Sequence, residues 1–146
     1  MATKVAINGF GRIGRLVARA ILERTDHDLD LVAINDLADA KANALLFKRD
    51  SVHGPAAGEV AFGDDWIMVD GHRIAVTRIP DPAAMAHHAS GIDLVIEASG
   101  QFTDRKSASG HIARGARRVL ISAPAKDADL TVVQGVNHGL LRPEHA

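Results

Sequence analysis

Three glycines near the start of the chain constrain its fold more than any other feature. Gly9, Gly11 and Gly14 form the pattern G-x-G-x-x-G. They follow a short β-branched run at 5–7 and precede a segment, 12–23, whose apolar residues recur at the spacing of one helical face. A glycine turn between a strand and a helix is typical of a parallel α/β sheet that binds a dinucleotide.

Each glycine has its own expected role. Gly9 permits a tight turn out of the strand, and Gly11 lets backbone N–H groups approach a pyrophosphate without an intervening Cβ. Gly14 lets the helix pack close to the strand. The pyrophosphate would lie at the positive N-terminal end of the helix, near Arg12, whose side chain either adds charge or faces solvent. The alternative is a helix start that needs small residues only for packing.

An acidic residue after the next predicted strand indicates which dinucleotide binds. Residues 29–35 (LDLVAIN) predict that strand, and Asp36 follows it, 22 positions after Gly14. The dinucleotide-binding pattern has an acidic residue at about 20 positions, where it accepts hydrogen bonds from ribose hydroxyls and repels a 2′-phosphate. Leu37 comes next, so no adjacent basic side chain could receive such a phosphate. We therefore expect NAD rather than NADP, with turn capping as a second or alternative role of Asp36.

The remaining chain alternates strand-like and helix-like segments. We expect a helix from Asp39, as its N-cap, to about Lys48, and antiparallel strands over 59–78 with Asp70-Gly71 as the hairpin turn. Further strands are expected at 92–97, 118–122 and 130–133, and further helices from Asp81-Pro82 and over 104–114. This alternation predicts an α/β fold, namely a doubly wound, mostly parallel Rossmann-type sheet with an antiparallel hairpin insertion. Residues 1–146 are expected to form one domain.

Composition excludes several classes of protein and site. The 146 residues include no cysteine, which excludes a disulfide, a Cys-ligated zinc site and a cysteine nucleophile within the chain. A net charge of −1 and 3% aromatic residues disfavour a nucleic-acid partner. The N-terminal segment is too short and broken for a signal peptide or a membrane span, so we expect a cytoplasmic protein with no membrane partner. Adjacent His87 and His88 are interpreted as surface side chains, and no metal site is expected.

Several segments together resemble glyceraldehyde-3-phosphate dehydrogenase. AINGFGRIGR (6–15) is similar to the opening of that family, and five more motifs follow in the family order across the whole chain: AINDL (33–37), DSVHG (50–54), IEASGQFT (96–103), VLISAPAKDAD (119–129) and GVNH (135–138). Two positions depart from the family pattern. Ala98-Ser99 stands where the family often has Ser-Thr or Cys-Thr, and Arg49 stands where an aromatic residue is common.

The resemblance implies a set of residues that bind NAD in addition to the three glycines. These are Arg12 and Ile13 for the pyrophosphate, Asp36 for the ribose, Arg78 beside the adenine, and Ser99, Gly100 and Ser122 around the nicotinamide half. From the residues alone, Arg78, Ser99 and Ser122 are loop residues at strand ends. That is where open α/β sheets bind their ligands.

The resemblance also implies chemistry that this chain does not carry. The family oxidises glyceraldehyde 3-phosphate in glycolysis through a cysteine thioester, with a histidine as base, and phosphate then releases the acyl group. Neither catalytic residue is matched here, so we expect an NAD-binding domain without its catalytic domain, weak in NAD binding and inactive alone. The complete enzyme is expected to be a homotetramer.

Two alternatives remain open from the sequence. One is the corresponding domain of erythrose-4-phosphate dehydrogenase, which differs mainly in its substrate. The other is a stand-alone nucleotide-binding module without catalysis. In either case, surfaces that would meet a catalytic domain and other subunits are expected to be exposed, which predicts self-association.

Overall fold

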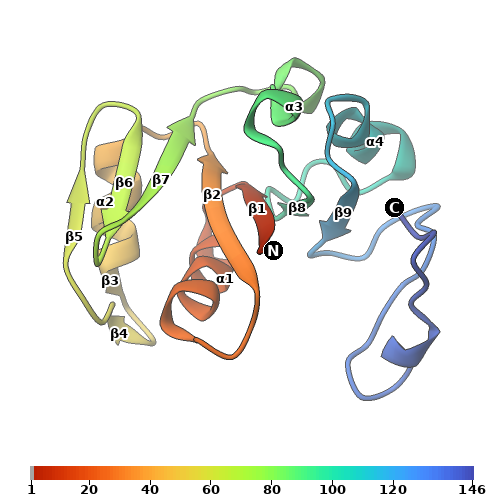
Figure 1. Cartoon of the computed structure of the whole chain (residues 1–146), viewed down its shortest axis with the longest axis horizontal. Coiled ribbons are helices and arrows are strands. Elements are labelled where there is room, and N and C mark those ends of the chain that lie inside the picture. Colours follow the sequence, from red (N-terminus) through yellow and green to blue (C-terminus); the bar gives the residue numbers. More distant parts are fainter. Residues whose placement is uncertain (1) are drawn as a thin grey trace.

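A seven-stranded mixed sheet organises the computed structural model, which describes residues 2–146 apart from the side chains of residues 88 and 89 (Figure 1). Its strand order is β5-β6-β7-β2-β1-β8-β9, in which the last five are mutually parallel and β5 and β6 are antiparallel to their neighbours. The strands are β1 (Thr3–Asn8), β2 (Leu29–Asn35), β5 (Val60–Phe62), β6 (Trp66–Val69), β7 (His72–Thr77), β8 (Leu94–Glu97) and β9 (Arg118–Ile121). A separate antiparallel pair consists of β3 (Arg49–Asp50) and β4 (Gly54–Pro55). The predicted fold class and its hairpin insertion are confirmed.

The helices connect the parallel strands. They are α1 (Arg12–Glu23), α2 (Ala40–Lys48), α3 (His87–Ser90) and α4 (Arg105–Ala113), with short 3-10 turns η1 (Pro82–Ala84) and η2 (His138–Leu140). Figure 1 shows α1 and α2 beside the strands drawn in red to yellow, and α3 and α4 beside those in green to blue. The crossover from β1 through α1 to β2 runs along the sheet in one direction, and the crossover from β8 through α4 to β9 runs in the other. Because such crossovers are right-handed, α1 and α4 cover opposite faces of the sheet.

Both faces of the central strand β1 are buried. Val5 and Ile7 enter the larger core, which includes Ala18 of α1 and Phe47 of α2. Ala6 points the other way, into a smaller cluster with residues of the β8 side. A strand buried on both faces is apolar throughout rather than alternating, which explains the uninterrupted apolar run before the glycines.

The hairpin turn and the helix caps follow local rules that the sequence makes visible. Asp70 and Gly71 both have positive φ, 48° and 83°, as a two-residue turn between twisted strands requires. Asp39 accepts a hydrogen bond from the amide of Ala42 at 2.7 Å and begins α2 as expected. Asp104 caps α4 in the same way.

Replacing Asp39 with alanine is expected to lower the free energy of unfolding by about 1 kcal/mol, because it leaves an N-terminal amide of α2 without its acceptor. Urea denaturation followed by circular dichroism measures this change. Asp39→Asn keeps an acceptor oxygen and serves as the control. Equal stability of the alanine and asparagine variants would contradict the capping role.

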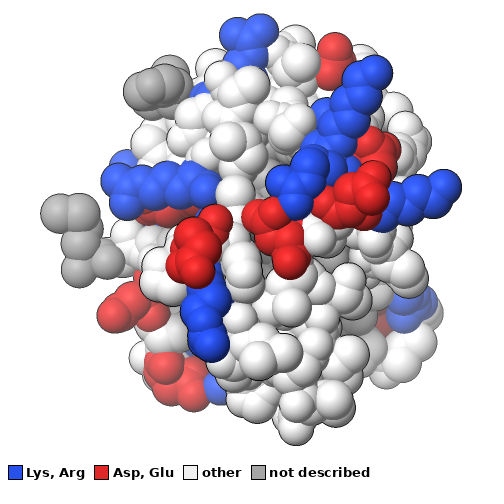
Figure 2. All heavy atoms as spheres, turned by 90° about the vertical axis from the view of Figure 1, so that its right-hand side faces the viewer, with Lys and Arg blue, Asp and Glu red and all other residues white. Residues whose placement is uncertain are grey.

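Two predicted elements differ from the structure. Residues 130–133 form no strand and lie in an exposed segment, with Val132 42% and Val133 54% accessible. Figure 2 shows the side of the molecule that carries this segment, with charges of both signs interspersed around uncharged surface. The helix expected from Pro82 ends after one turn, because Met85 takes an extended conformation (ψ 151°) before α3 begins.

Candidate nucleotide-binding site

The glycine loop joins β1 to α1 at the carboxyl end of the parallel sheet. Gly11 is the N-cap of α1, in extended conformation, and no side-chain hydrogen bond caps this helix among the described residues. The first N–H groups of a helix have no partner within the helix, and the helix dipole adds positive potential there. This end of α1 can therefore accept an anionic group such as a pyrophosphate.

The three glycines differ in the space around them. A Cβ on Gly9, whose φ is +89°, would lie 2.5 Å from the Cα and N atoms of Ser99. A Cβ on Gly14 would overlap the carbonyl oxygen of Gly9. A Cβ on Gly11 would meet no atom within 4 Å. Gly9 and Gly14 are thus required by the packing of the protein itself, whereas the space at Gly11 is open for a ligand.

Asp36 connects the end of β2 to the glycine loop. Its Oδ2 accepts a hydrogen bond from the amide of Phe10 at 2.7 Å, and its Oδ1 accepts one from the amide of Ala38 at 2.9 Å. The turn-capping role is therefore present. Each carboxylate oxygen keeps a further lone pair, so the half-buried side chain can also accept hydrogen bonds from ribose hydroxyls.

The residues that the resemblance implies follow five adjacent strands. Arg78 comes after β7, Asp36 after β2, the glycine loop after β1, Ser99 after β8 and Ser122 after β9. The Nε of Arg78 donates to the carbonyl of Leu37 at 3.1 Å, which brings this arginine beside the residue after Asp36. Arg78 and Ser122 stand at opposite ends of the row, so only an extended ligand could reach both.

Arg12, Ile13, Gly100 and Ser122 are all exposed. Ile13 and Arg12 lie in the first turn of α1, where the Arg12 guanidinium approaches the hydroxyl of Ser51 at 3.4 Å. Gly100 is exposed, with φ +75°. Ser122 is exposed as well, and its amide donates to the carbonyl of Glu97 at 3.0 Å, which continues the pairing of β8 and β9.

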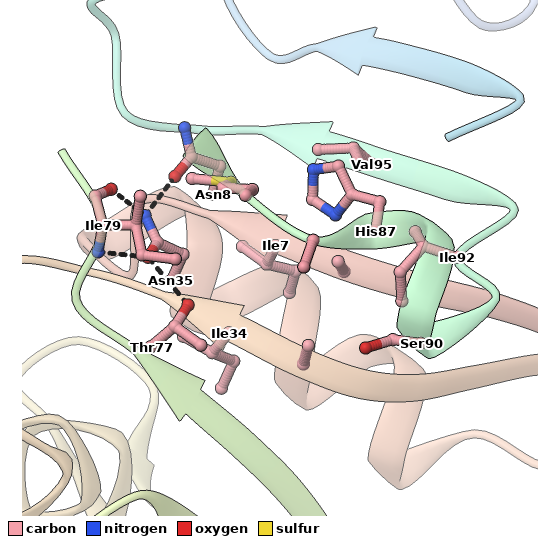
Figure 3. Close-up of a pocket in the computed structure, with 14 residues that line it drawn as sticks. Ile7, Asn8, Ile34, Asn35, Thr77, Ile79, His87, Ser90, Ile92 and Val95 are labelled. Atoms are coloured by element: carbon pink, nitrogen blue, oxygen red, sulfur yellow. Dashed lines mark hydrogen bonds between the residues drawn. The ribbon is translucent and has the colours of Figure 1, made fainter. Parts of the chain in front are cut away.

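A row of polar side chains lies under this site, and sequence reasoning missed it. Thr77, Asn35, Asn8 and Glu97 are each the last residue of a strand, and the registers of the sheet place them side by side. Figure 3 shows Asn35 at the centre of hydrogen bonds to Asn8, Thr77 and Ile79. The available signal was a polar residue that ends each of four apolar strands.

Glu97 is the charged member of the row and has almost no solvent contact. It is 1% exposed, and its Oε2 lies 3.0 Å from Nε2 of His111, which is 0% exposed. Burial tends to raise the pKa of Glu97, but hydrogen bonds from His111, Ser99 and Asn8 outweigh it and hold the pKa below its usual value. The carboxylate is therefore ionised and fully engaged.

His87 is a correction to the sequence interpretation. It was expected on the surface, but it is buried, and its Nε2 lies 2.9 Å from Nδ1 of His111. Burial, followed by the neighbouring His111, lowers the pKa of His87 to about 4. The side chain of His88 lies outside the described residues.

A cavity of about 120 Å³ adjoins the polar row and is lined in part by Asn8, Asn35, Met85 and His87 (Figure 3). Ala6 and Val95 also line it, so it opens on the α3 side of the sheet rather than at the N-terminus of α1. Over residues 2–146, apart from the two undescribed side chains, no group of three or more His, Asp or Glu residues could hold a metal ion. In the same part of the chain, no helix is long and apolar enough to cross a bilayer.

Comparison with known proteins identifies the family. Residues 3–105 match the family model described as glyceraldehyde 3-phosphate dehydrogenase, NAD binding domain. The chain belongs to the glyceraldehyde-3-phosphate dehydrogenase family. Its match is to the NAD-binding domain of that family, and NAD is accordingly its cofactor.

Similar curated relatives cover nearly the whole chain. A glyceraldehyde-3-phosphate dehydrogenase of Zymomonas mobilis is 57% identical over 94% of this chain, and one of Xanthobacter flavus is 54% identical over 99%. One of Thermotoga maritima is 50% identical over 97%. The chain spans only 41% to 43% of the length of these three dehydrogenases.

Proposed function

We propose that the chain binds NAD across the carboxyl ends of β7, β2, β1, β8 and β9. The observation that carries this proposal is the contrast among the three glycines, since only Gly11 leaves open space beside the uncapped N-terminus of α1. In the proposed pose, the backbone amides of Arg12 and Ile13 hold the pyrophosphate. The ribose of the adenosine half bonds to Asp36, and the adenine lies beside Arg78.

The nicotinamide half would lie toward Ser99, Gly100 and Ser122, at the ends of β8 and β9. When bound, NAD supplies a hydride acceptor. The residues of this chain bind and orient it. Asp36 also selects against a 2′-phosphate, because two anionic groups at this distance repel each other in a half-buried site.

We further propose that this domain serves a phosphorylating glyceraldehyde-3-phosphate dehydrogenase, and the names of its relatives support that activity over the erythrose-4-phosphate alternative. The 146 residues contain no cysteine, so no thiolate for a thioester comes from this chain. We therefore expect the chain to be inactive by itself and to bind NAD weakly. The one-domain organisation over 1–146, the cytoplasmic location and the homotetrameric complete enzyme remain predictions.

The exposed apolar side chains of the C-terminal segment fit the expected self-association. Val132, Val133, Val136, Leu140 and Leu141 are all exposed there. Apolar groups gathered on one segment favour contact with another protein surface. Sedimentation over micromolar concentrations would reveal this association, and a strictly monomeric species would count against it.

Exchanging Asp36 for asparagine is expected to reduce the ratio of the affinity for NAD to the affinity for NADP by at least about tenfold. The change removes the charge that repels a 2′-phosphate and weakens the acceptors for the ribose hydroxyls. Isothermal titration calorimetry with both dinucleotides measures the two affinities.

The control for that experiment is Asp39→Asn, which alters a nearby carboxylate that caps α2 and leaves Asp36 intact. This variant should keep the wild-type preference. The proposal of NAD binding would fail if the wild-type chain took up no NAD at millimolar concentration. An unchanged preference in Asp36→Asn would remove the assigned role of that residue.

A further inference from the structure

A continuous chain of side-chain hydrogen bonds runs beneath the glycine loop, from the segment after β7 to the turn after β8. At its first end, Asn35 holds the segment that carries Arg78. Its Oδ1 accepts from the amide of Ile79 at 2.8 Å, and its Nδ2 donates to the carbonyl of Ile79 at 2.8 Å. Both backbone groups of the residue after Arg78 are thus fixed by one side chain.

The middle of the chain passes directly under the glycine loop. Nδ2 of Asn35 donates to Oδ1 of Asn8 at 2.8 Å, and Nδ2 of Asn8 donates to Oε2 of Glu97 at 2.6 Å. Asn8 is the residue before Gly9. All three residues are buried, so bulk water competes little for these bonds.

At its second end, Glu97 holds the turn that contains Ser99. Its Oε1 accepts from the amide of Ser99 at 2.9 Å and from the hydroxyl of Ser99. The Ser99 oxygen in turn accepts from the amide of Gln101 at 3.2 Å. The turn between β8 and the next segment therefore takes its shape from one carboxylate.

Both oxygens of Glu97 are needed for this arrangement. While Oε1 holds Ser99, Oε2 receives Asn8 and His111, and His111 is held by His87. A buried carboxylate is costly unless its bonds are complete, and here they are. An apolar residue at position 97 would leave the Ser99 amide and the Nε2 of His111 without partners.

We propose that Glu97 and Asn35 are positioning residues that act on opposite halves of the NAD site. Glu97 shapes the turn that receives the nicotinamide half, and Asn35 shapes the segment that receives the adenosine half. Neither touches the cofactor, because both side chains are buried under the loop. This inference rests on the proposed pose of NAD.

The test compares the affinities for NAD, ADP-ribose and ADP in the full chain by calorimetry. NAD and ADP-ribose differ only by the nicotinamide, whereas all three ligands share the adenosine half. Glu97→Gln keeps the size of the side chain but has a single acceptor oxygen. The buried donors Asn8 and His111 retain that oxygen, so the NH2 group of the glutamine faces the half-buried amide of Ser99, which loses its acceptor. Asn35→Ser keeps a polar group but cannot reach Ile79, and the adjoining cavity can admit water to the freed groups.

The two variants are expected to give opposite patterns. Glu97→Gln should lower the affinity for NAD by about tenfold and leave the affinities for ADP-ribose and ADP within about twofold of the wild-type values. Asn35→Ser should weaken all three ligands by about tenfold and leave the ratio of NAD to ADP-ribose unchanged. Glu59→Gln, which removes a carboxylate from an exposed residue beside the hairpin, is the matched control and should change none of them.

Several results would overturn the inference. For Glu97→Gln, these are an equal loss of affinity for all three ligands, or no loss of affinity at all. For Asn35→Ser, it is a loss of affinity confined to NAD. For the wild-type chain, it is an affinity for NAD no higher than that for ADP-ribose. Failure of the proposed function looks different, since the wild-type chain would then bind none of the ligands.

A measurement on the unaltered chain covers the case in which a variant does not fold. In amide NMR spectra, NAD should shift the Ser99 and Gln101 signals, while ADP-ribose should leave them in place and shift those of Phe10 and Ile79. The Ser99 amide should also move as Glu97 is protonated at low pH, because it donates to that carboxylate. A Ser99 amide signal whose chemical shift changes neither on addition of NAD nor on acidification would overturn the proposal.

Discussion

Replacing Gly9 with alanine is expected to lower the free energy of unfolding by at least about 3 kcal/mol. The backbone of Gly9 has φ +89°, where an L-residue is strained by about 1–2 kcal/mol. The new Cβ would also lie 2.5 Å from the Cα of Ser99 and 2.8 Å from the carbonyl carbon of Ala98. These are backbone atoms at the end of a central strand, and they cannot move aside without disturbing the sheet. Urea denaturation followed by circular dichroism measures the loss.

Gly11→Ala is the matched control for that substitution, two residues along the same loop. Gly11 has φ −69°, and its Cβ would meet nothing within 4 Å, so the stability should change by less than about 1 kcal/mol. The smaller entropy of the unfolded chain favours alanine, and the N-cap position favours glycine. The affinity for NAD should nevertheless fall by about tenfold or more, because the methyl group occupies the approach of the pyrophosphate. Wild-type NAD binding in this variant, or wild-type stability in Gly9→Ala, would contradict the roles assigned to the two glycines.

Acidification from about pH 6.5 to pH 4 is expected to cost up to about 3 kcal/mol of stability through His87 alone. Its pKa is lowered from the ordinary 6.5 to about 4 in the folded chain, first by burial and then by His111. The unfolded chain therefore binds a proton at a higher pH than the folded chain. The contribution is complete above pH 6.5 and is lost as the pH falls toward 4, at about 1.4 kcal/mol for each pKa unit. Glu97, whose pKa is also lowered, adds a loss in the same direction at lower pH.

His87→Gln separates this contribution from general acid sensitivity. Its amide can still donate to Nδ1 of His111, but it takes up no proton in this range. The fall in unfolding free energy between pH 6.5 and pH 4, measured by urea denaturation at several pH values, should therefore be clearly shallower. His138→Gln changes an exposed histidine and should keep the wild-type slope. Equal slopes in both variants would refute the assignment to His87.

Local rules account for the features that the sequence predicted correctly. The turn at Asp70-Gly71 and the cap at Asp39 depend on residues within three positions of each other. The order of strands and helices likewise follows from periodicity and from the glycine loop. The strand expected at 130–133 is wrong because β-branched residues favour extended backbone whether or not a neighbouring strand is available to pair with it.

The features that the sequence did not predict depend on distant pairings. His87 is buried because α4 brings His111 against it, and the short run around His87 contains no sign of that contact. In the sequence, Asn8 and Glu97 are ordinary polar residues at the ends of two strands. They become one unit only because the register of β1 against β8 places them side by side, 89 positions apart in the chain.

That separation has a consequence for the order of folding. The row of polar side chains under the site takes one residue from each of four strands. Its last member in the sequence, Glu97, lies two thirds of the way along the chain. A chain emerging from the ribosome can build the β1–α1–β2 unit early, glycine loop included, because those contacts are local. It cannot fix the turn at Ser99 until β8 has inserted beside β1 and closed the long loop between them. In the proposed pose, the nicotinamide half of NAD can therefore be bound only after β8 has joined the sheet.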